Sequence, residues 1–403
     1  MSEIVELNGR RYRKPKQPTV IICVDGCDPR YIDRGIADGV FRFIGSFGRA
    51  GHLGAAEAVV PTFTNPNNVS IVTGAPPAVH GISGNYYLDR ESGREIMMTD
   101  ENLMRSETIL ALMARAGVKT AAITAKDKLR KLLGRNLAGI CFSSEYADHE
   151  TEALVGRRRP DMYSADLSLF VLDAGIALLE RGAATLLYLS LSDYVQHAHA
   201  PGTPEADGFN RALDDRVRRF VEMGAVVGLV ADHGMNDKAK TDGAPNVIFL
   251  EDELNGRFGD GSVRVICPIT DPFVRHHGAL GSFVRGYARN APDIPSLMAA
   301  SAALPGVALV LDGADAARRF ELPLDREADF VALGDDNTAI GAARAEHDLS
   351  GLAGHRLRSH GGIGEQLVPF ILSRPLTPEY RDIAATRRLR NFDIFDFALN
   401  GAA

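Results

Sequence analysis

The sequence predicts an α/β protein in which a doubly wound, mainly parallel sheet carries helices on both faces. Short apolar runs rich in β-branched residues recur along the first half of the chain, and each ends in a polar loop. Amphipathic stretches with helical spacing separate these runs. Strands that alternate with helices in this way form parallel sheets, because each crossover helix covers one face of the sheet.

Five apolar runs are expected to be strands of this sheet, and three amphipathic stretches are expected to be helices between them. The stretch 106–116 opens with a Ser and a Glu, as capped helices do. In open parallel sheets the ligand site lies beyond the carboxyl ends of the strands, so the residues after each strand matter most. The expected strands are 18–24, 118–124, 185–191, 225–230 and 366–372, and the expected helices are 106–116, 167–181 and 203–223.

The rhythm of the sequence changes between about residues 245 and 358, where the apolar runs are shorter. This change predicts a smaller α+β insertion. We expect residues 1–244 and 359–403 to form one α/β core, and residues 245–358 to form a cap that borders the ligand pocket. The elements expected in the insertion are strands at 263–266, 307–311 and 330–333 and a helix at 294–304.

Composition and charge exclude several classes of protein. Hydrophobic residues make up 45% and charged residues 24%, which excludes disordered, collagen-like and coiled-coil chains. No apolar run approaches the roughly 20 residues that span a bilayer, and the basic N-terminus lacks the apolar segment of a secretory signal. The net charge of −7 provides no general basic field for nucleic acid. We expect a cytoplasmic protein with neither a membrane nor a nucleic-acid partner, and the sequence leaves a homodimer open.

The four cysteines are too few and too scattered for a disulfide framework, so we expect reduced and mostly buried thiols. They are Cys23, Cys27, Cys141 and Cys267. Cys23 and Cys27 flank Asp25, and a metal role is the alternative to burial among their small apolar neighbours.

Three of the predicted strands end in residues that can bind metal ions. Carboxylate oxygens together with imidazole nitrogens suit zinc, which keeps one coordination position open in catalytic sites. For each aspartate the alternative is a turn or a helix cap, the commoner role after a strand. The candidates are Asp25 after the first strand, Asp193 and His197 after the third, and Asp232 with His233 after the fourth.

Two further positions stand out. Thr64 lies in a polar, turn-rich segment, 59–83, with helical residues expected after it. Its hydroxyl is either a helix cap or a nucleophile activated by a metal, placed where backbone N–H groups favour phosphate oxygens. His360 comes just before the last predicted strand, beside glycines that allow close approach of the backbone.

In combination these segments resemble the alkaline phosphatase superfamily, and within it the nucleotide pyrophosphatase/phosphodiesterase branch. The resemblance extends from about residue 18 to residue 372, and it implies an alkaline phosphatase-like fold with two zinc ions and a threonine nucleophile. The matching segments, in order, are Asp25, 61–64 (PTFT), 80–85 (HGISGN), 192–194 (SDY) with His197, 231–235 (ADHGM) and 359–361 (SHG).

The resemblance also implies a role for each matching residue. Thr64 would be the nucleophile, and Asn85 would donate to a phosphoryl oxygen together with the Thr64 backbone amide. Manganese or iron could replace zinc. His80 receives no role, and His199, which does not match by spacing, is expected to be structural or to support a ligand. The implied ligands of one zinc ion are Asp193, His197 and His360, and those of the other are Asp25, Thr64, Asp232 and His233.

The segment 124–129 (TAKDKL), directly after the second strand, is similar to the phosphonoacetate hydrolase family. In that family two lysines at this place neutralise the substrate carboxylate, which implies the same role for Lys126 and Lys128. An isolated Lys-x-Lys is more often a solvated charge pair. In an extended chain the two side chains would project to one side, whereas in a helix they would diverge by about 200°.

The implied reaction is cleavage of the C–P bond of a small anionic phosphonate to acetate and phosphate through a phosphothreonine intermediate. A phosphodiesterase or nucleotide pyrophosphatase of the same superfamily is the first alternative. It would need a slot for a nucleobase, and the chain has no Trp, although Tyr86, Tyr87 and Tyr194 could serve. A catalytically silent phosphonate- or metal-binding module is the second alternative.

Overall fold

A seven-stranded sheet forms the centre of the protein. The computed structural model describes residues 3–270, 278–350 and 356–403. The strands of this sheet are β3 (Thr19–Cys23), β4 (His52–Glu57), β7 (Thr120–Thr124), β8 (Ile140–Ser143), β9 (Leu186–Ser190), β10 (Val226–Val230) and β19 (Leu367–Leu372). Their order is β4-β19-β10-β3-β9-β7-β8. The strands from β10 to β8 are parallel, and β19 is antiparallel to both of its neighbours, so the mainly parallel sheet is confirmed.

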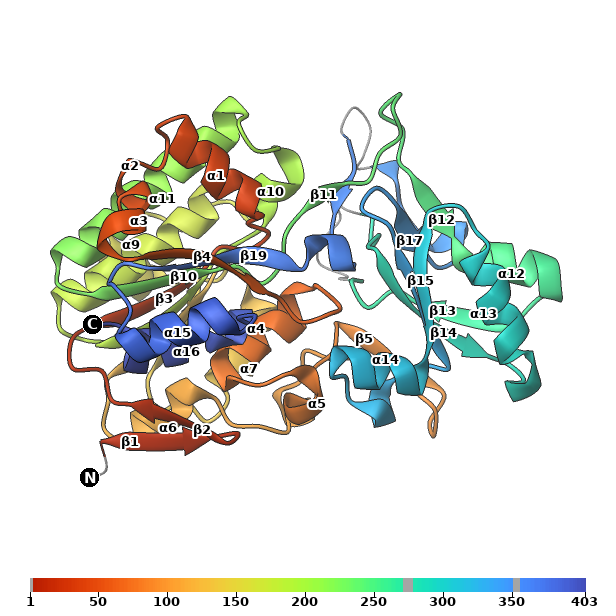
Figure 1. The fold of residues 1–403 in the computed structure, drawn as a ribbon, viewed down its shortest axis with the longest axis horizontal. Coiled ribbons are helices and arrows are strands. Elements are labelled where there is room, and N and C mark those ends of the chain that lie inside the picture. The colour runs from red at the N-terminus through yellow and green to blue at the C-terminus, as the bar shows by residue number, and fades with distance from the viewer. Residues whose placement is uncertain (1–2, 271–277, 351–355) are drawn as a thin grey trace.

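Helices cover both faces of this sheet, as predicted. They include α1 (Pro29–Ala37), α4 (Thr64–Thr73), α6 (Ile109–Arg115), α7 (Asp127–Gly134), α9 (Asp166–Glu180), α11 (Pro204–Glu222) and α16 (Ile394–Asp396). Figure 1 shows α1, α9 and α11 on one face and α4, α7 and α16 on the other. Within the described ranges no helix combines the length and apolarity needed to cross a membrane.

Helix α11 illustrates why these segments are helical. Thr203 caps its first turn by accepting from the Ala206 amide, and Pro204 occupies the first helical position. Phe209, Leu213 and Phe220 are among its buried residues, which recur at helical spacing and turn one face to the sheet.

The expected start of the helix at 106–116 was wrong. Helix α6 begins at Ile109, and its cap is Thr108, whose hydroxyl accepts from the Ala111 amide. The hydroxyl of Ser106 contacts the side chain of Asn8 instead. A cap must stand immediately before the first helical residue, and only Thr108 does so.

Strands β4 and β8 of the sheet, and a hairpin that precedes the sheet, were not predicted from the sequence. The hairpin pairs β1 (Ile4–Leu7) with β2 (Arg10–Arg13) around Asn8-Gly9, and both turn residues have positive φ angles. Asn-Gly between two short strands is the usual signal of such a turn, so this hairpin could have been predicted from the sequence. Strand β4 has the sequence HLGAAE, which lacks the β-branched residues on which strand prediction depends.

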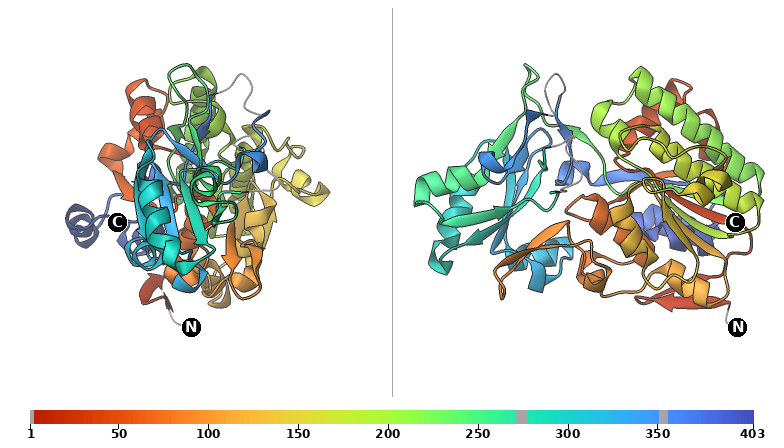
Figure 2. Two further views of the ribbon diagram at one scale, coloured as in Figure 1. Left: turned by 90° about the vertical axis from the view of Figure 1, so that its right-hand side faces the viewer. Right: turned by 180° about the vertical axis from the view of Figure 1, so that it is seen from behind.

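The insertion contains a second sheet with its own core. Its strands are β13 (Val263–Ile266), β14 (Phe283–Ala288), β15 (Val307–Asp312) and β16 (Phe330–Gly334), and its helices include α12 (Leu250–Phe258), α13 (Ile294–Ala302) and α14 (Gly313–Phe320). The sheet is antiparallel in the order β13-β14-β16-β15, and it lies apart from the main sheet (Figure 2). Phe63 of the main body belongs to this second core and meets Phe283 edge-to-face. The boundaries at 245 and 358 stay a prediction.

The register of three adjacent parallel strands brings polar residues together. Cys23 of β3 pairs with Val230 of β10 and with Ser190 of β9. Asp25 lies two residues after Cys23, and Asp232 lies two residues after Val230. Asp193 lies three residues after Ser190. All three carboxylates therefore reach the same edge of the sheet.

Candidate metal centre

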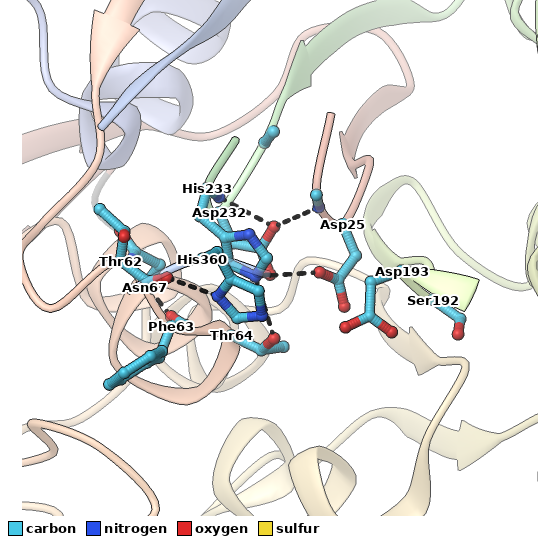
Figure 3. Close-up of polar contacts among 12 residues, drawn as sticks. Asp25, Thr62, Phe63, Thr64, Asn67, Ser192, Asp193, Asp232, His233 and His360 are labelled. Atoms are coloured by element: carbon cyan, nitrogen blue, oxygen red, sulfur yellow. Dashed lines mark hydrogen bonds and ion pairs between the residues drawn. The ribbon is translucent and has the colours of Figure 1, made fainter. Parts of the chain in front are cut away.

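Six of the predicted ligands converge in two neighbouring groups at this edge. In each group one possible ligand atom per residue lies within 4.8 Å of the others. The His233 and His360 rings join the groups, because they stack with centroids 3.6 Å apart (Figure 3). All six residues are buried. The first group is Asp193, His197 and His360, and the second is Asp25, Asp232 and His233.

Glycines allow the loops that carry these ligands to approach one another. Gly26, directly after Asp25, has a φ of +70°, and a Cβ there would lie 3.1 Å from Cβ of Gln196. Its amide donates to Oδ1 of Asp232 at 3.2 Å. Gly361, directly after His360, has a φ of +123°, and a Cβ there would lie 2.5 Å from the Phe63 ring. A larger residue at either position would displace a ligand-bearing loop.

Backbone carbonyls orient the three histidines and set the tautomer that each ring has when it is neutral. Nδ1 of each ring lies 2.7 to 2.8 Å from a carbonyl oxygen: His197 contacts Arg358, His233 contacts Gly234 and His360 contacts Thr62. Since a carbonyl only accepts, Nδ1 of each ring donates, and the lone pair of the neutral ring is on Nε2. Histidine ligands of metals have this arrangement, so the site fits a cation.

The carboxylates impose a strong demand for positive charge. Burial, followed by the charges of Asp193 and Asp232, raises the pKa of Asp25 well above its usual value. Apart from the ion pair of Oδ1 with His233, neither oxygen of Asp25 has a hydrogen-bond partner among the described residues. Nζ of Lys126 lies 2.7 Å from Oδ1 of Asp193 and supplies one positive charge. A divalent cation would supply the rest.

The pKa of His233 also reflects the need for positive charge beside these carboxylates. Burial lowers its pKa, but Asp232 and Asp25 outweigh burial and raise the pKa of His233 to about 9. Its Nε2 lies 3.3 Å from Oδ1 of Asp25. Without a metal the proton on this ring balances the carboxylates, and a bound cation would replace that proton.

Thr64 lies beside the second group at the start of α4. The N-cap of this helix is Phe63, in an extended conformation, so Thr64 is not the cap that was its alternative role. Its Oγ1 lies 3.3 Å from Nε2 of His233. The hydroxyl is thus next to the candidate cation position, and the N-terminal end of a helix favours an anion there.

The two predicted lysines flank the start of helix α7. Lys126 precedes the helix with an extended backbone, and Lys128 is in its first turn. The segment 126–128 is therefore neither fully extended nor fully helical, and it lies between the two conformations considered for the lysines. Lys126 contacts the candidate ligand Asp193, an interaction that sequence reasoning missed because the two residues are 67 positions apart.

Asn85 is anchored on the insertion. Its backbone amide donates to the Pro268 carbonyl at 2.7 Å, and its side-chain Nδ2 donates to the Ile269 carbonyl at 3.1 Å. Arg285 of β14 holds the same segment by donating to the carbonyl and hydroxyl of Ser83. No hydrogen bond found among the described residues joins Asn85 to either group of ligands.

The remaining histidines and the cysteines lie outside the two groups. His80 is buried against the Ser70 hydroxyl at 2.8 Å, and burial lowers its pKa to about 3. His199 pairs weakly with Glu205 at 3.8 Å. All four cysteines are free thiols and three of them are buried. Neither group of candidate ligands contains Cys23 or Cys27.

Comparisons with known proteins agree with this fold. The sequence profile described as type I phosphodiesterase / nucleotide pyrophosphatase matches residues 19–276, and the chain belongs to this family. Phosphonoacetate hydrolase from Sinorhizobium meliloti 1021, solved in complex with phosphonoformate, is 45% identical with a TM-score of 0.94 over 100% of both chains. The complex of that protein with phosphonoacetate has 44% identity and the same TM-score of 0.94. The predicted resemblance is confirmed.

Two further matches are informative in different ways. Human ectonucleotide pyrophosphatase/phosphodiesterase 5 is 15% identical, covers 96% of each chain and has a TM-score of 0.65, which shows a shared fold. A phosphonoacetate hydrolase from Penicillium oxalicum is 53% identical over 47 residues. That match spans 11% of this chain and 65% of the Penicillium protein.

Replacing Asp25 by Asn is expected to change stability in opposite directions with and without metal. A carboxyl whose pKa is raised by folding stabilises the protein at low pH, and this stabilisation is lost as the pH rises through the folded pKa. At neutral pH the metal-free Asp25→Asn variant should therefore melt roughly 2 °C or more above the wild type. With added Zn²⁺ it should melt below the wild type. Thermal unfolding with and without chelator measures both.

Asp28→Asn is the matched control in the same loop. Both carboxylate oxygens of Asp28 contact the Arg30 guanidinium, so this variant should be less stable in both conditions. If metal-free Asp25→Asn loses as much stability as Asp28→Asn, the carboxylates do not form a charge-deficient cation site.

Proposed function

We propose that the protein hydrolyses the C–P bond of phosphonoacetate to acetate and inorganic phosphate. The observation that carries the proposal is the pair of acidic and histidine groups beside Thr64, in a chain 45% identical throughout to the Sinorhizobium enzyme. That enzyme was solved with phosphonoacetate bound, which supports a small anionic phosphonate as the substrate.

The proposal assigns two Zn²⁺ ions to the site, with Mn²⁺ or Fe²⁺ as substitutes. Bound zinc ions act as Lewis acids that ease proton loss from a coordinated hydroxyl or water and offset the charge of the phosphonate. Two residue types, carboxylate and imidazole, make up both groups and suit this metal. The proposed ligands are Asp193, His197 and His360 for one ion, and Asp25, Thr64, Asp232 and His233 for the other.

Thr64 acts as the nucleophile in this proposal. Its deprotonated oxygen forms a bond to phosphorus while the C–P bond breaks, and the electron pair of that bond passes into the carboxymethyl group. The resulting enediolate takes up a proton through water, which balances the proton that the Thr64 hydroxyl lost, and gives acetate. A water molecule then attacks phosphorus, the P–O bond to Thr64 breaks, and phosphate leaves as the threonine oxygen regains a proton from that water.

Lys126 and Lys128 stabilise the negative charge that develops on the leaving group. Ammonium groups held in place beside the substrate carboxylate act most strongly when water is excluded. Lys126 is largely buried and already paired with Asp193, so it is fixed before the substrate binds. Asn85 uses one N–H for the Ile269 carbonyl and keeps a second for a phosphoryl oxygen.

Residues of the insertion form hydrogen bonds with two of the proposed site residues. The Ser282 amide donates to the carbonyl of His360 at 2.9 Å, and Pro268 and Ile269 hold Asn85. We propose that residues 245–358 act as a cap that excludes large esters. A cytoplasmic location and a homodimer stay predictions.

A phosphodiesterase activity is the second candidate, favoured by the family to which the chain belongs. The same metals and Thr64 would then act on a larger ester. Tyr194 and Tyr163 form an aromatic pair with centroids 6.4 Å apart next to Asp193, which could contact a base.

Thr64→Ala is expected to abolish turnover while zinc remains bound. Loss of the nucleophile should lower kcat by about 10³-fold or more, whereas three protein ligands remain for the affected ion. Phosphate release and zinc content, measured on the same preparation, check both. Thr73→Ala, at the far end of helix α4, is the control and should stay active. Unchanged activity of Thr64→Ala would remove the threonine from its proposed role.

Rates of cleavage of phosphonoacetate, a nitrophenyl diester and an aryl phosphate distinguish the two candidate functions. The wild type should cleave phosphonoacetate faster than a nitrophenyl diester. Lys126→Ala and Lys128→Ala should each lose roughly 10- to 100-fold on phosphonoacetate, as expected for a lost charge-assisted hydrogen bond, and far less on an aryl phosphate. Lys128→Ala is the cleaner variant, because Lys126 also pairs with Asp193.

Lys131→Ala is the control for this panel, since Lys131 is exposed on the same helix. It should match the wild type on every substrate. Faster cleavage of the diester would favour the phosphodiesterase, and equal losses on both substrates would assign the lysines to the scaffold.

A further inference from the structure

Asn68 is fully buried in helix α4, one turn after Thr64, and no role for it was predicted from the sequence. Its side chain makes four hydrogen bonds. Nδ2 donates to the carbonyl of Thr64 at 2.9 Å and to Oδ2 of Asp232 at 3.1 Å. Oδ1 accepts from the Tyr188 hydroxyl at 2.7 Å and from the Ser190 hydroxyl at 2.8 Å. These four bonds fill the capacity of an amide side chain.

The chemistry of the partners fixes which way this amide points. The carbonyl of Thr64 and the carboxylate of Asp232 only accept, so the NH₂ group must face them. The two hydroxyls, on strand β9, can donate to the carbonyl oxygen on the other side. One side chain thus links the strand, the start of the helix and the loop after strand β10.

Among the described residues, these hydrogen bonds leave one lone-pair position of the Asp232 carboxylate without a donor. Oδ1 accepts from the Gly26 amide at 3.2 Å and the His233 amide at 3.0 Å. Oδ2 accepts from Asn68. A carboxylate has about four lone-pair positions, so one remains, on Oδ2. A cation at this group can therefore meet Asp232 through one oxygen, whose direction Asn68 sets.

We propose that Asn68 is a positioning residue that fixes Oδ2 of Asp232 and the backbone of Thr64 relative to each other. The inference rests on the proposed function, in which Asp232 binds a metal ion and Thr64 is the nucleophile. Tyr188 and Ser190 take part indirectly, because they hold the amide in its orientation. Partners of this kind around metal ligands contribute to both affinity and orientation.

The decisive variant is Asn68→Asp, which keeps the size of the side chain but replaces both N–H donors by an acceptor. A carboxylate oxygen would then face the Thr64 carbonyl and Oδ2 of Asp232. The zinc affinity of the Asp25, Asp232 and His233 group should fall by about 10- to 100-fold, and that of the Asp193, His197 and His360 group should change little. Competition with a chromophoric chelator, starting from metal-free protein, measures the two affinities.

Kinetics at saturating zinc test the second half of the inference. The Asn68→Asp variant should lose kcat for phosphonoacetate more than it changes KM, because the Thr64 backbone shifts while the lysines stay in place. A merely structural role would lower the melting temperature and leave the two zinc affinities and the kcat to KM relation unchanged.

A double variant decides the question if Asn68→Asp does not fold. Tyr188→Phe/Ser190→Ala removes both donors to Oδ1 and keeps the Asn68 amide, so its loss of zinc affinity should be smaller but confined to the same group. Folded variants with two wild-type zinc affinities would overturn the inference. Zinc binding needs no substrate, so a wild type that binds zinc but does not cleave phosphonoacetate would refute the proposed function alone.

Discussion

The structure depends on one electrostatic constraint: three buried carboxylates lie together at one edge of the sheet. Burial, followed by the charges of Asp193 and Asp232, raises the pKa of Asp25 well above its usual value. Buried charges of one sign are tolerated only when opposite charge compensates them. Lys126 and the ring of His233 provide part of that charge, and the remainder is the physical reason for proposing metal ions.

Backbone groups, as well as side chains, position the carboxylates and the histidines. Parallel pairing of β10, β3 and β9 brings the three strand ends level. Backbone carbonyls orient the histidines, and two glycines let the loops pack closely. The insertion adds the Ser282 amide behind His360, so the main body and the insertion both help to hold the site. The site is therefore preorganised, which is what electrostatic catalysis requires.

Much of this arrangement could be predicted from the sequence, because apolar strands followed by Asp and His carry a local signal. Residues such as Asp25 and Asp232 were placed at the correct sheet edge for that reason. The contacts around them could not be predicted. The pairs Lys126–Asp193 and Asn68–Asp232 join residues 67 and 164 positions apart, and only the packed fold brings them together. Strand β4 also escaped prediction, because pairing with β19 rather than its own composition makes it a strand.

Anomalous X-ray diffraction at the zinc absorption edge, from crystals of the purified protein, tests the proposed metal centre most directly. Two anomalous peaks are expected. One should be enclosed by Asp193, His197 and His360, and the other by Asp25, Asp232 and His233 with the Thr64 hydroxyl beside it. Peaks elsewhere on the molecule, or zinc-loaded crystals with no peak at these six residues, would contradict the proposed metal centre.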